Sequence, residues 1–175
     1  ASSPADVSVS VSAVNDAPVL ATVSDVSFDE DGSGSTSLSA DDVDGDDLTY
    51  SITGGSDITA ELTGSDVSFS APTDYNGSET FSVSVSDGEY TDSQIITVTI
   101  NAVNDAPVLS SVGDRDVDED TSLNFLLSAF DVEGDALTYN ITSGTNVIST
   151  LTGNDLTFTP TQDFNGNESF TLTVS

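Results

Sequence analysis

The chain has 175 residues, a formal net charge of −30 and a single basic residue, Arg115. It therefore lacks the cationic surface that nucleic acids and anionic membranes require, and we expect neither as a partner. It contains no His and no Cys, which removes the commonest general base and the thiol nucleophile, so we expect no enzyme. No apolar run approaches the roughly 20 residues that span a bilayer, which predicts no membrane insertion.

The elements that the sequence predicts are all β-strands. Residues 6–14 (DVSVSVSAV) alternate Val with small or polar residues, and the same alternation returns in seven later segments separated by turn signals such as Asn76-Gly77 and Asp87-Gly88. A period of two residues is typical of half-buried antiparallel strands. No segment has a helical period. The seven expected strands cover residues 19–28, 35–40, 48–53, 58–63, 66–70, 79–86 and 93–102.

A repeat of 89 residues organises the chain. AVNDAPVL occurs at residues 13–20 and again at 102–109, and 37 of the 72 aligned pairs between residues 15–86 and 104–175 are identical. Seven short strands per repeat predict an all-β fold of two tandem Greek-key β-sandwiches, cadherin- or immunoglobulin-like, the second without its last strand. The expected domains are residues 15–103 and residues 104–175, and residues 1–14 form either the last strand of a preceding domain or a donor strand.

The apolar positions of these strands define an expected core for the first repeat. They lie on one face of each strand, with Ser or Thr on the other. The residues are Val23, Phe28, Leu38, Leu48, Tyr50, Ile52, Leu62, Phe69, Phe81, Val83, Val85, Ile96, Val98 and Ile100.

The acidic residues are concentrated in turns and at strand ends, in the motifs NDAP, DED, DVDGD, DYNG and SDG. Carboxylates a few ångströms apart repel one another by up to about 4 kcal/mol per pair at an effective dielectric constant of 20. A bound cation relieves that repulsion, and ligand sets made only of oxygen favour Ca²⁺ over Zn²⁺ or copper. The alternative is a solvated acidic surface that aids solubility.

Four motifs in register, each present twice, carry a family resemblance. They are the VNDAP linker, the Glu-Asp pair of the DED motif, the sequence A-x-D-x-D/E-G followed by LTY-x-I, and the sequence D-Y/F-N-G before the penultimate strand. Together they make the chain similar to a cadherin repeat, and most closely to the calcium-dependent, cadherin-like tandem repeats of large bacterial surface adhesins. The resemblance covers essentially the whole chain.

The resemblance implies Ca²⁺ at the joints between successive domains. The joint after the first repeat would take ligands from both repeats and the linker, namely Glu30, Asp74, Asn104, Asp105, Asp131 and Glu133, with Asp31 as a less certain addition. The joint before the first repeat would use Asn15, Asp16, Asp42, Asp44 and Asp87, and a downstream joint would use Glu119 and Asp163. Ala13 and Ala102 stand where the animal family has an Asp, and Asn76 and Asn165 stand where it has a Glu. We therefore expect fewer ions or weaker binding than in animal cadherins.

The function that the resemblance implies is structural. Ca²⁺ at each joint would stiffen an extracellular stalk or spacer in an adhesin, filament or biofilm matrix, whose partners are neighbouring repeats or identical subunits placed end to end. The alternative is a binding module whose β-sandwich loops hold a glycan or a protein. Residues 6–14 align with residues 95–103, so the chain is either an excerpt of a longer array or a subunit that donates this strand to its neighbour.

Overall fold

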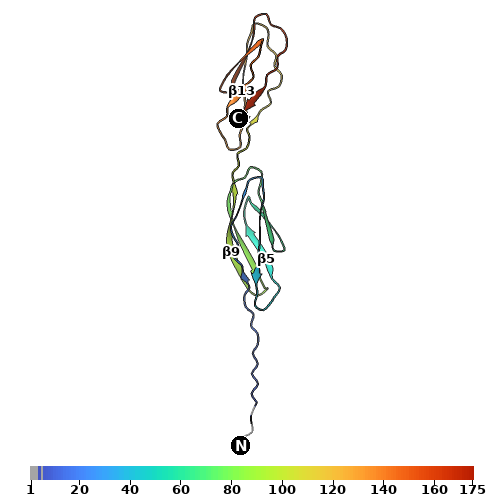
Figure 1. The fold of residues 1–175 in the computed structure, drawn as a ribbon, viewed down its shortest axis with the longest axis vertical. Coiled ribbons are helices and arrows are strands. Elements are labelled where there is room, and N and C mark those ends of the chain that lie inside the picture. Colours follow the sequence, from blue (N-terminus) through green and yellow to red (C-terminus); the bar gives the residue numbers. More distant parts are fainter. Residues whose placement is uncertain (1–3, 5) are drawn as a thin grey trace. The chain divides into compact units, whose positions relative to one another are not determined.

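The computed structural model describes residue 4 and residues 6–175, which contain strands, turns and coil but no helix. The chain divides into two compact units, residues 1–103 and residues 104–175, called unit 1 and unit 2 here and coloured along the sequence in Figure 1. The prediction of an all-β fold is confirmed. Within the described residues, no helix is long and apolar enough to cross a membrane.

Unit 1 is a β-sandwich whose two main sheets have the strand orders β2-β9-β8-β5 and β3-β7-β6. β1 and β4 form a separate two-stranded sheet. All pairings are antiparallel except β2 with β9, which is parallel. The strands are β1 (Val19–Leu20), β2 (Val26–Asp29), β3 (Gly34–Ser37), β4 (Ala40–Asp41), β5 (Thr49–Gly54), β6 (Thr59–Thr63), β7 (Asp66–Ser70), β8 (Gly77–Ser86) and β9 (Thr91–Asn101).

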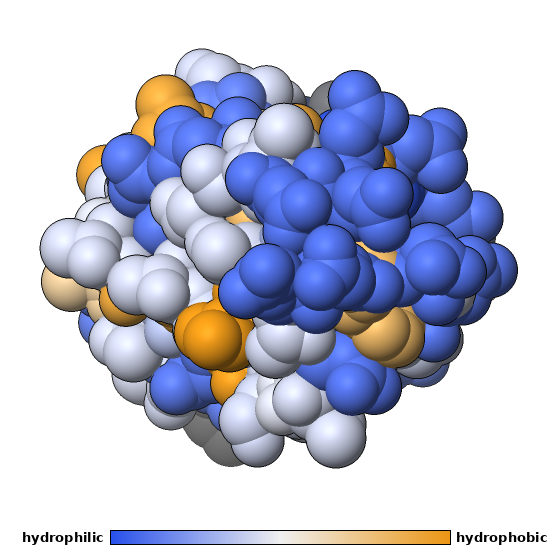
Figure 2. Space-filling model, turned by 90° about the horizontal axis from the view of Figure 1, so that it is seen from above, coloured by the Kyte–Doolittle hydropathy of each residue, from blue (hydrophilic) through white to orange (hydrophobic). Residues whose placement is uncertain are grey.

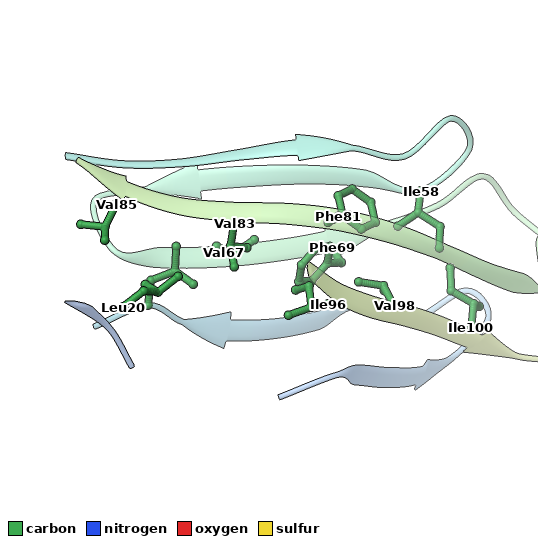
Figure 3. Close-up of a cluster of buried hydrophobic side chains, with 11 residues drawn as sticks. Leu20, Ile58, Val67, Phe69, Phe81, Val83, Val85, Ile96, Val98 and Ile100 are labelled. Atoms are coloured by element: carbon green, nitrogen blue, oxygen red, sulfur yellow. The ribbon is translucent and has the colours of Figure 1, made fainter. Parts of the chain in front are cut away.

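Alternation along the strands builds the core between the two main sheets of unit 1 (Figure 3). On β9 the side chains of Ile96, Val98 and Ile100 are buried, whereas Ile95 is 76% exposed. Phe69 and Phe81 meet edge to face, with ring centroids 5.3 Å apart. The buried cluster consists of Leu20, Leu38, Ile58, Val67, Phe69, Phe81, Val83, Val85, Ile96, Val98 and Ile100.

Eight of the expected core residues are fully buried, and the other six are partly buried against the same cluster. The expected set missed three buried residues. Leu20 belongs to the linker motif and Ile58 directly precedes β6, so neither stands in an alternating run. Val67 lies two residues before Phe69 on β7 and shares its buried face, so the alternation of that strand already indicated its burial.

The expected strand over residues 19–28 is divided in the structure. β1 pairs with β4, and β2 pairs with β9 in the other sheet. The intervening backbone bonds to side chains instead, since the amide N–H of Val23 donates to Gln94 at 3.1 Å and the Gln94 amide donates to the carbonyl of Leu20 at 3.0 Å. The chain thus passes from one sheet to the next.

Unit 2 repeats this plan in part. Its sheets have the orders β11-β15-β14, β13-β16 and β10-β12. Within the described residues it contains no counterpart of β9, and no strand is assigned over residues 115–118, the counterpart of β2. The strands are β10 (Val108–Leu109), β11 (Leu123–Leu126), β12 (Ala129–Phe130), β13 (Tyr139–Ile141), β14 (Val147–Thr152), β15 (Asp155–Pro160) and β16 (Leu172–Val174).

The core of unit 2 is more open than that of unit 1. Phe158 and Phe170, the counterparts of Phe69 and Phe81, are only half-buried, although their ring centroids lie 4.6 Å apart. Arg115 lies 5.1 Å from the centroid of the Phe125 ring, a cation–π contact. In unit 2, therefore, aromatic rings that unit 1 encloses remain accessible.

Candidate metal sites

The acidic residues of each unit gather into two clusters. The linker cluster combines the Asn-Asp pair of the linker with the D-x-D/E loop, and the DED cluster combines the DED motif with the Asp of D-Y/F-N-G. Figure 2 shows one face of the molecule on which hydrophilic residues form a broad patch and hydrophobic residues are isolated spots. The linker clusters are Asn15, Asp16, Asp42, Asp44 and Asp87 in unit 1 and Asn104, Asp105, Asp131 and Glu133 in unit 2, and the DED clusters are Glu30, Asp31 and Asp74 in unit 1 and Glu119, Asp120 and Asp163 in unit 2.

In the linker cluster of unit 1, Asp42 organises the D-x-D loop. Its Oδ1 accepts the backbone N–H groups of Asp44, Gly45 and Asp46 at 2.9, 2.9 and 3.2 Å. Gly45 has a φ of 78°, which lets the loop curl around that oxygen. The other oxygen, Asp42 Oδ2, is buried and has no hydrogen-bond partner. A buried carboxylate oxygen without a donor is costly, and a cation ligand is one way to satisfy it.

The rest of this cluster is connected by hydrogen bonds. The amide of Asn15 donates to Asp87 Oδ2 at 3.0 Å, and the backbone N–H of Asp16 donates to Asp44 Oδ2 at 2.8 Å. The linker residues and the two loops therefore meet within unit 1, although they are up to 72 residues apart in sequence.

Two carboxyl groups at this cluster have shifted pKa values, in opposite directions and for different reasons. The backbone N–H of Tyr90, followed by that of Glu89, lowers the pKa of Asp87, against the opposing effect of desolvation. Desolvation raises the pKa of Asp46, and the carboxylates of Asp42 and Asp44 raise it further. The smaller contribution of these carboxylates shows that like charges lie close together here, and such a cluster of negative charge attracts cations.

The linker cluster of unit 2 repeats two of these contacts. Asp131 is 8% exposed, and its Oδ1 accepts the backbone N–H of Asp135 at 2.8 Å. The backbone N–H of Asp105 donates to Glu133 Oε2 at 3.3 Å, which repeats the bond between Asp16 and Asp44. The repeated contacts indicate that both linkers are seated on the D-x-D/E loop of the unit that follows them.

The DED cluster of unit 1 contains a buried acid. Glu30 is 7% exposed, its Oε1 accepts the backbone N–H of Val103, and its Oε2 is buried without a partner. Its own backbone N–H donates to the carbonyl of Asn101 at 3.0 Å. The end of β9 therefore holds Glu30 in place by its backbone and leaves one carboxylate oxygen free to bind a cation.

Backbone strain is concentrated in the DED clusters. Among the described residues, four that are not glycine have a positive φ, at 60°, 58°, 63° and 57°, and all are aspartates of these two clusters. Each pair is joined by one hydrogen bond, from a backbone N–H to a carboxylate, at 3.3 Å in unit 1 and 3.2 Å in unit 2. Such strain is characteristic of functional sites. The four residues are Asp31, Asp74, Asp120 and Asp163.

The DED clusters of the two units differ in how deeply their glutamate is buried. Glu119, the counterpart of Glu30, is exposed. The sequence grouped Asp31 with the ligands only as a less certain addition, and its hydrogen bond to Asp74 now places it in the cluster. Whether any of these residues binds a metal stays a prediction.

Sequence reasoning missed one charged position in each unit. The carboxylate of Glu79 on β8 accepts the backbone N–H groups of Ser56, Asp57 and Ile58 at 2.8, 3.1 and 3.1 Å. In unit 2, Glu168 accepts those of Thr145, Asn146 and Val147. The sequence did carry one indication of these residues. Glu79 and Glu168 occupy equivalent positions in the two repeats and lie outside every acidic motif.

Replacing Glu79 with Gln should destabilise unit 1 by about 1–2 kcal/mol at neutral pH, because a charged acceptor of backbone hydrogen bonds is lost. The N–H of Ser56 is the main cause of the lowered pKa of Glu79, ahead of opposing desolvation. A lowered pKa contributes stability above the ordinary value of 4.5, and this stability is lost as the pH falls through the lowered value.

Urea unfolding of the native chain and of Glu79→Gln at several acid pH values measures how this contribution to the free energy of unfolding depends on pH. The variant should lose less stability than the native chain as the pH falls below about 4.5, because Gln at position 79 has no carboxylate that can take up a proton. Glu61→Gln, at an exposed position on β6, is the matched control. If the free energy of unfolding depends on pH in the same way for the native chain and for Glu79→Gln, the Glu79 carboxylate does not stabilise unit 1 as proposed.

Comparison with known proteins decides the family. The bacterial Ig domain family matches residues 15–99 and again residues 104–175, which together cover most of the chain. The chain belongs to the bacterial Ig domain family. Its two bacterial Ig domains coincide with the two repeats. Domains of this type are usually extracellular or surface-exposed and are typically not enzymes.

One of the similar solved structures, with a TM-score above 0.5, supports the same fold. Human protocadherin-24 EC1-2, crystal form II, has 19% identity and a TM-score of 0.54, over 92% of this chain and 95% of that one. A second structure of human protocadherin-24 EC1-2 has 19% identity and a TM-score of 0.47, over 93% and 94%. An endo-fucoidan hydrolase of glycoside hydrolase family 107 has 25% identity and a TM-score of 0.39, over 90% of this chain and 26% of that one. No curated protein shows significant similarity.

These findings support the coarse part of the predicted resemblance. The pair of bacterial Ig domains shares its fold with cadherin ectodomains. Tandem domains of this kind suggest a structural extracellular repeat. Calcium dependence and adhesion stay predictions.

Proposed function

We propose that this pair of bacterial Ig domains is a calcium-binding spacer of an extracellular adhesin or filament. The observation that carries the proposal is the pair of buried carboxylate oxygens without hydrogen-bond partners, Glu30 Oε2 and Asp42 Oδ2. Each belongs to a cluster of oxygen ligands with no nitrogen or sulfur donor, a set that suits Ca²⁺.

We propose the same calcium ligands that the family resemblance implied. Before the first domain they are Asn15, Asp16, Asp42, Asp44 and Asp87, and after it they are Glu30 and Asp74 with Asp31. We propose that the linker residues Asn104 and Asp105 and the acids Asp131 and Glu133 complete the joint, and that Glu119 and Asp163 serve the next one. Ca²⁺ neutralises carboxylates that otherwise repel, so the ion would restrict a linker that alone is a hinge.

Thermal unfolding in chelator, in millimolar Ca²⁺ and in millimolar Mg²⁺ tests this function. Extracellular modules bind Ca²⁺ with a Kd of about 10⁻⁴–10⁻³ M, so each filled site should add about 0.4–1.4 kcal/mol at about 1 mM Ca²⁺. The melting temperature should rise in Ca²⁺ and rise little in Mg²⁺, which needs stricter octahedral geometry. Equal melting temperatures in chelator and in Ca²⁺ would contradict the proposal and mean that the acidic clusters are only a solvated surface.

We also propose that these spacers join end to end through residues 6–14. The side chains of Val7, Val9 and Val11 are 85, 80 and 92% exposed. Under the 89-residue shift they align with Ile96, Val98 and Ile100, which are buried on β9. A segment with the pattern of a buried strand and no strand partner of its own is suited to donation to another sheet.

A further inference from the structure

Unit 2 exposes several large hydrophobic side chains on one side of its sandwich. Their exposed fractions are 66% for Val108, 68% for Leu126, 68% for Phe130 and 57% for Ile148. These residues lie on β10, β11, β12 and β14, in the sheets β10-β12 and β11-β15-β14. Every strand of these sheets has a counterpart in unit 1, in the sheets β1-β4 and β3-β7-β6. The hydrophobic side chains are therefore exposed on a part of the sandwich that both units form.

Three of these residues line one strip of the sheet surface. Val108 and Phe130 are paired directly across β10 and β12, so their side chains stand next to each other. Exposed residues alternate with more buried ones from residue 124 to residue 130. This alternation places Leu126 and Phe130 in one outward-pointing row, with Ser128 between them. Val108, Leu126 and Phe130 are called the apolar strip here.

The corresponding face of unit 1 is polar and partly charged. At four exposed positions, unit 1 has a hydroxyl-bearing or acidic residue where unit 2 has a hydrophobic residue or Thr. Under the 89-residue shift the pairs are Ser37 and Leu126, Asp41 and Phe130, Thr59 and Ile148, and Glu61 and Thr150. The face of unit 2 thus has more apolar area and two fewer carboxylates, and contiguous exposed apolar surface marks interaction sites.

Charge is nearly absent from this face of unit 2. Strands β10, β11, β12, β14 and β15 contain one acidic residue, Asp155. Its carboxylate accepts a hydrogen bond from the side-chain amide of Asn124. The whole chain has a net charge of −30, so two copies repel one another wherever rows of carboxylates would meet. This face of unit 2 therefore allows a second copy to approach, whereas the same face of unit 1 opposes it with Asp41, Glu61 and Asp66.

The size of the face agrees with a weak dimer. Strands lie about 4.8 Å apart and rise about 3.3 Å per residue, so β10, β11 with β12, β15 and β14 together cover roughly 500 Å². Two such faces in contact would bury about 1,000 Å² in total, which is the lower limit for a specific interface. In a two-fold dimer both copies use the same face, so every residue of the apolar strip contributes twice.

We infer that this sheet face of unit 2 binds the same face of a second copy of this chain, with the apolar strip at the centre of a two-fold contact. The contact is independent of the end-to-end joining proposed above, because it involves no residue of the segment 6–14. It gives a closed dimer and not a growing polymer. It also includes no residue of the linker or DED clusters, so it does not depend on the calcium proposal.

Sedimentation velocity of the full chain in chelator, over a range of concentrations, tests this contact. The native chain should dimerise. Leu126→Ser combined with Phe130→Asp installs the residues that unit 1 has at these positions, so the change is compatible with the fold. It should weaken dimerisation by about 100-fold or more, because both copies lose apolar contacts and two carboxylates would meet at the centre of the interface.

A matched control removes an equally exposed hydrophobic side chain elsewhere. Ile95 on β9 of unit 1 is 76% exposed, and Ile95→Asp adds the same charge, so dimerisation should change by less than about 3-fold. Ile148→Thr, a milder change to the residue of unit 1, should weaken dimerisation by about 3-fold or more. Melting temperatures in chelator check that each variant is folded.

Val9→Asp combined with Val11→Asp separates this contact from end-to-end joining, and the dimer should persist in that variant. Loss of association there would assign it to residues 6–14 and overturn the inference. A dimer that Leu126→Ser with Phe130→Asp leaves intact would overturn it as well. So would a native chain that stays monomeric at millimolar concentration, even if its apolar strip binds the hydrophobic dye ANS, since the strip would then serve a different partner.

Discussion

Replacing Glu30 with Gln is expected to remove most of the stabilisation that Ca²⁺ gives to unit 1, and to change its stability in chelator by less than about 1 kcal/mol. The Gln oxygen can still accept the backbone N–H of Val103, so the local bond survives. What disappears is the negative charge of Oε2, the buried oxygen that has no other partner. Removing one anionic ligand should weaken calcium binding at this cluster about 10-fold or more, which corresponds to about 1.4 kcal/mol.

Calorimetric melts in chelator and in millimolar Ca²⁺ measure this difference directly. Glu61→Gln removes the same charge from an exposed position on β6 and should keep the full calcium response. If Glu30→Gln and Glu61→Gln respond equally to Ca²⁺, Glu30 is a structural residue that holds the end of β9 and not a ligand. A large loss of stability for Glu30→Gln in chelator would point to the same conclusion.

Phe81→Ala is expected to be the most damaging single change in unit 1, at about 3–5 kcal/mol. Its ring is 1% exposed and packs edge to face on Phe69. The counterpart change, Phe170→Ala, should cost less than half as much, because Phe170 is already half-buried in the described chain. The difference in stability loss between Phe81→Ala and Phe170→Ala therefore measures how much less buried the core of unit 2 is.

Hydrogen exchange measured by mass spectrometry separates the two units. Phe81→Ala should increase exchange in β5, β8 and β9 while leaving the peptides of unit 2 unchanged. Equal losses of stability for the two substitutions would contradict the difference in packing between the units.

The candidate sites were predicted in part. The spacing of acids in DVDGD and DED located both kinds of cluster, because carboxylates at turns recur at fixed places in each repeat. The sequence did not separate Glu30, which is buried with a free oxygen, from its exposed counterpart Glu119. That difference depends on the backbone at the end of β9, which reaches Glu30 from 73 residues away. Glu79 was missed for a similar reason, since its three donors lie on a distant loop.

By itself the sequence determined the local features of this protein: a period of two residues, turns at Gly and Asn, and a repeat of 89 residues. These follow from backbone geometry and side-chain alternation, which neighbouring residues control. The tertiary structure decided the rest. Burial depends on which strand covers a residue, so only the fold enclosed Phe81 and buried Glu30 beneath the end of β9. Long-range pairing, which no local pattern encodes, sets these differences.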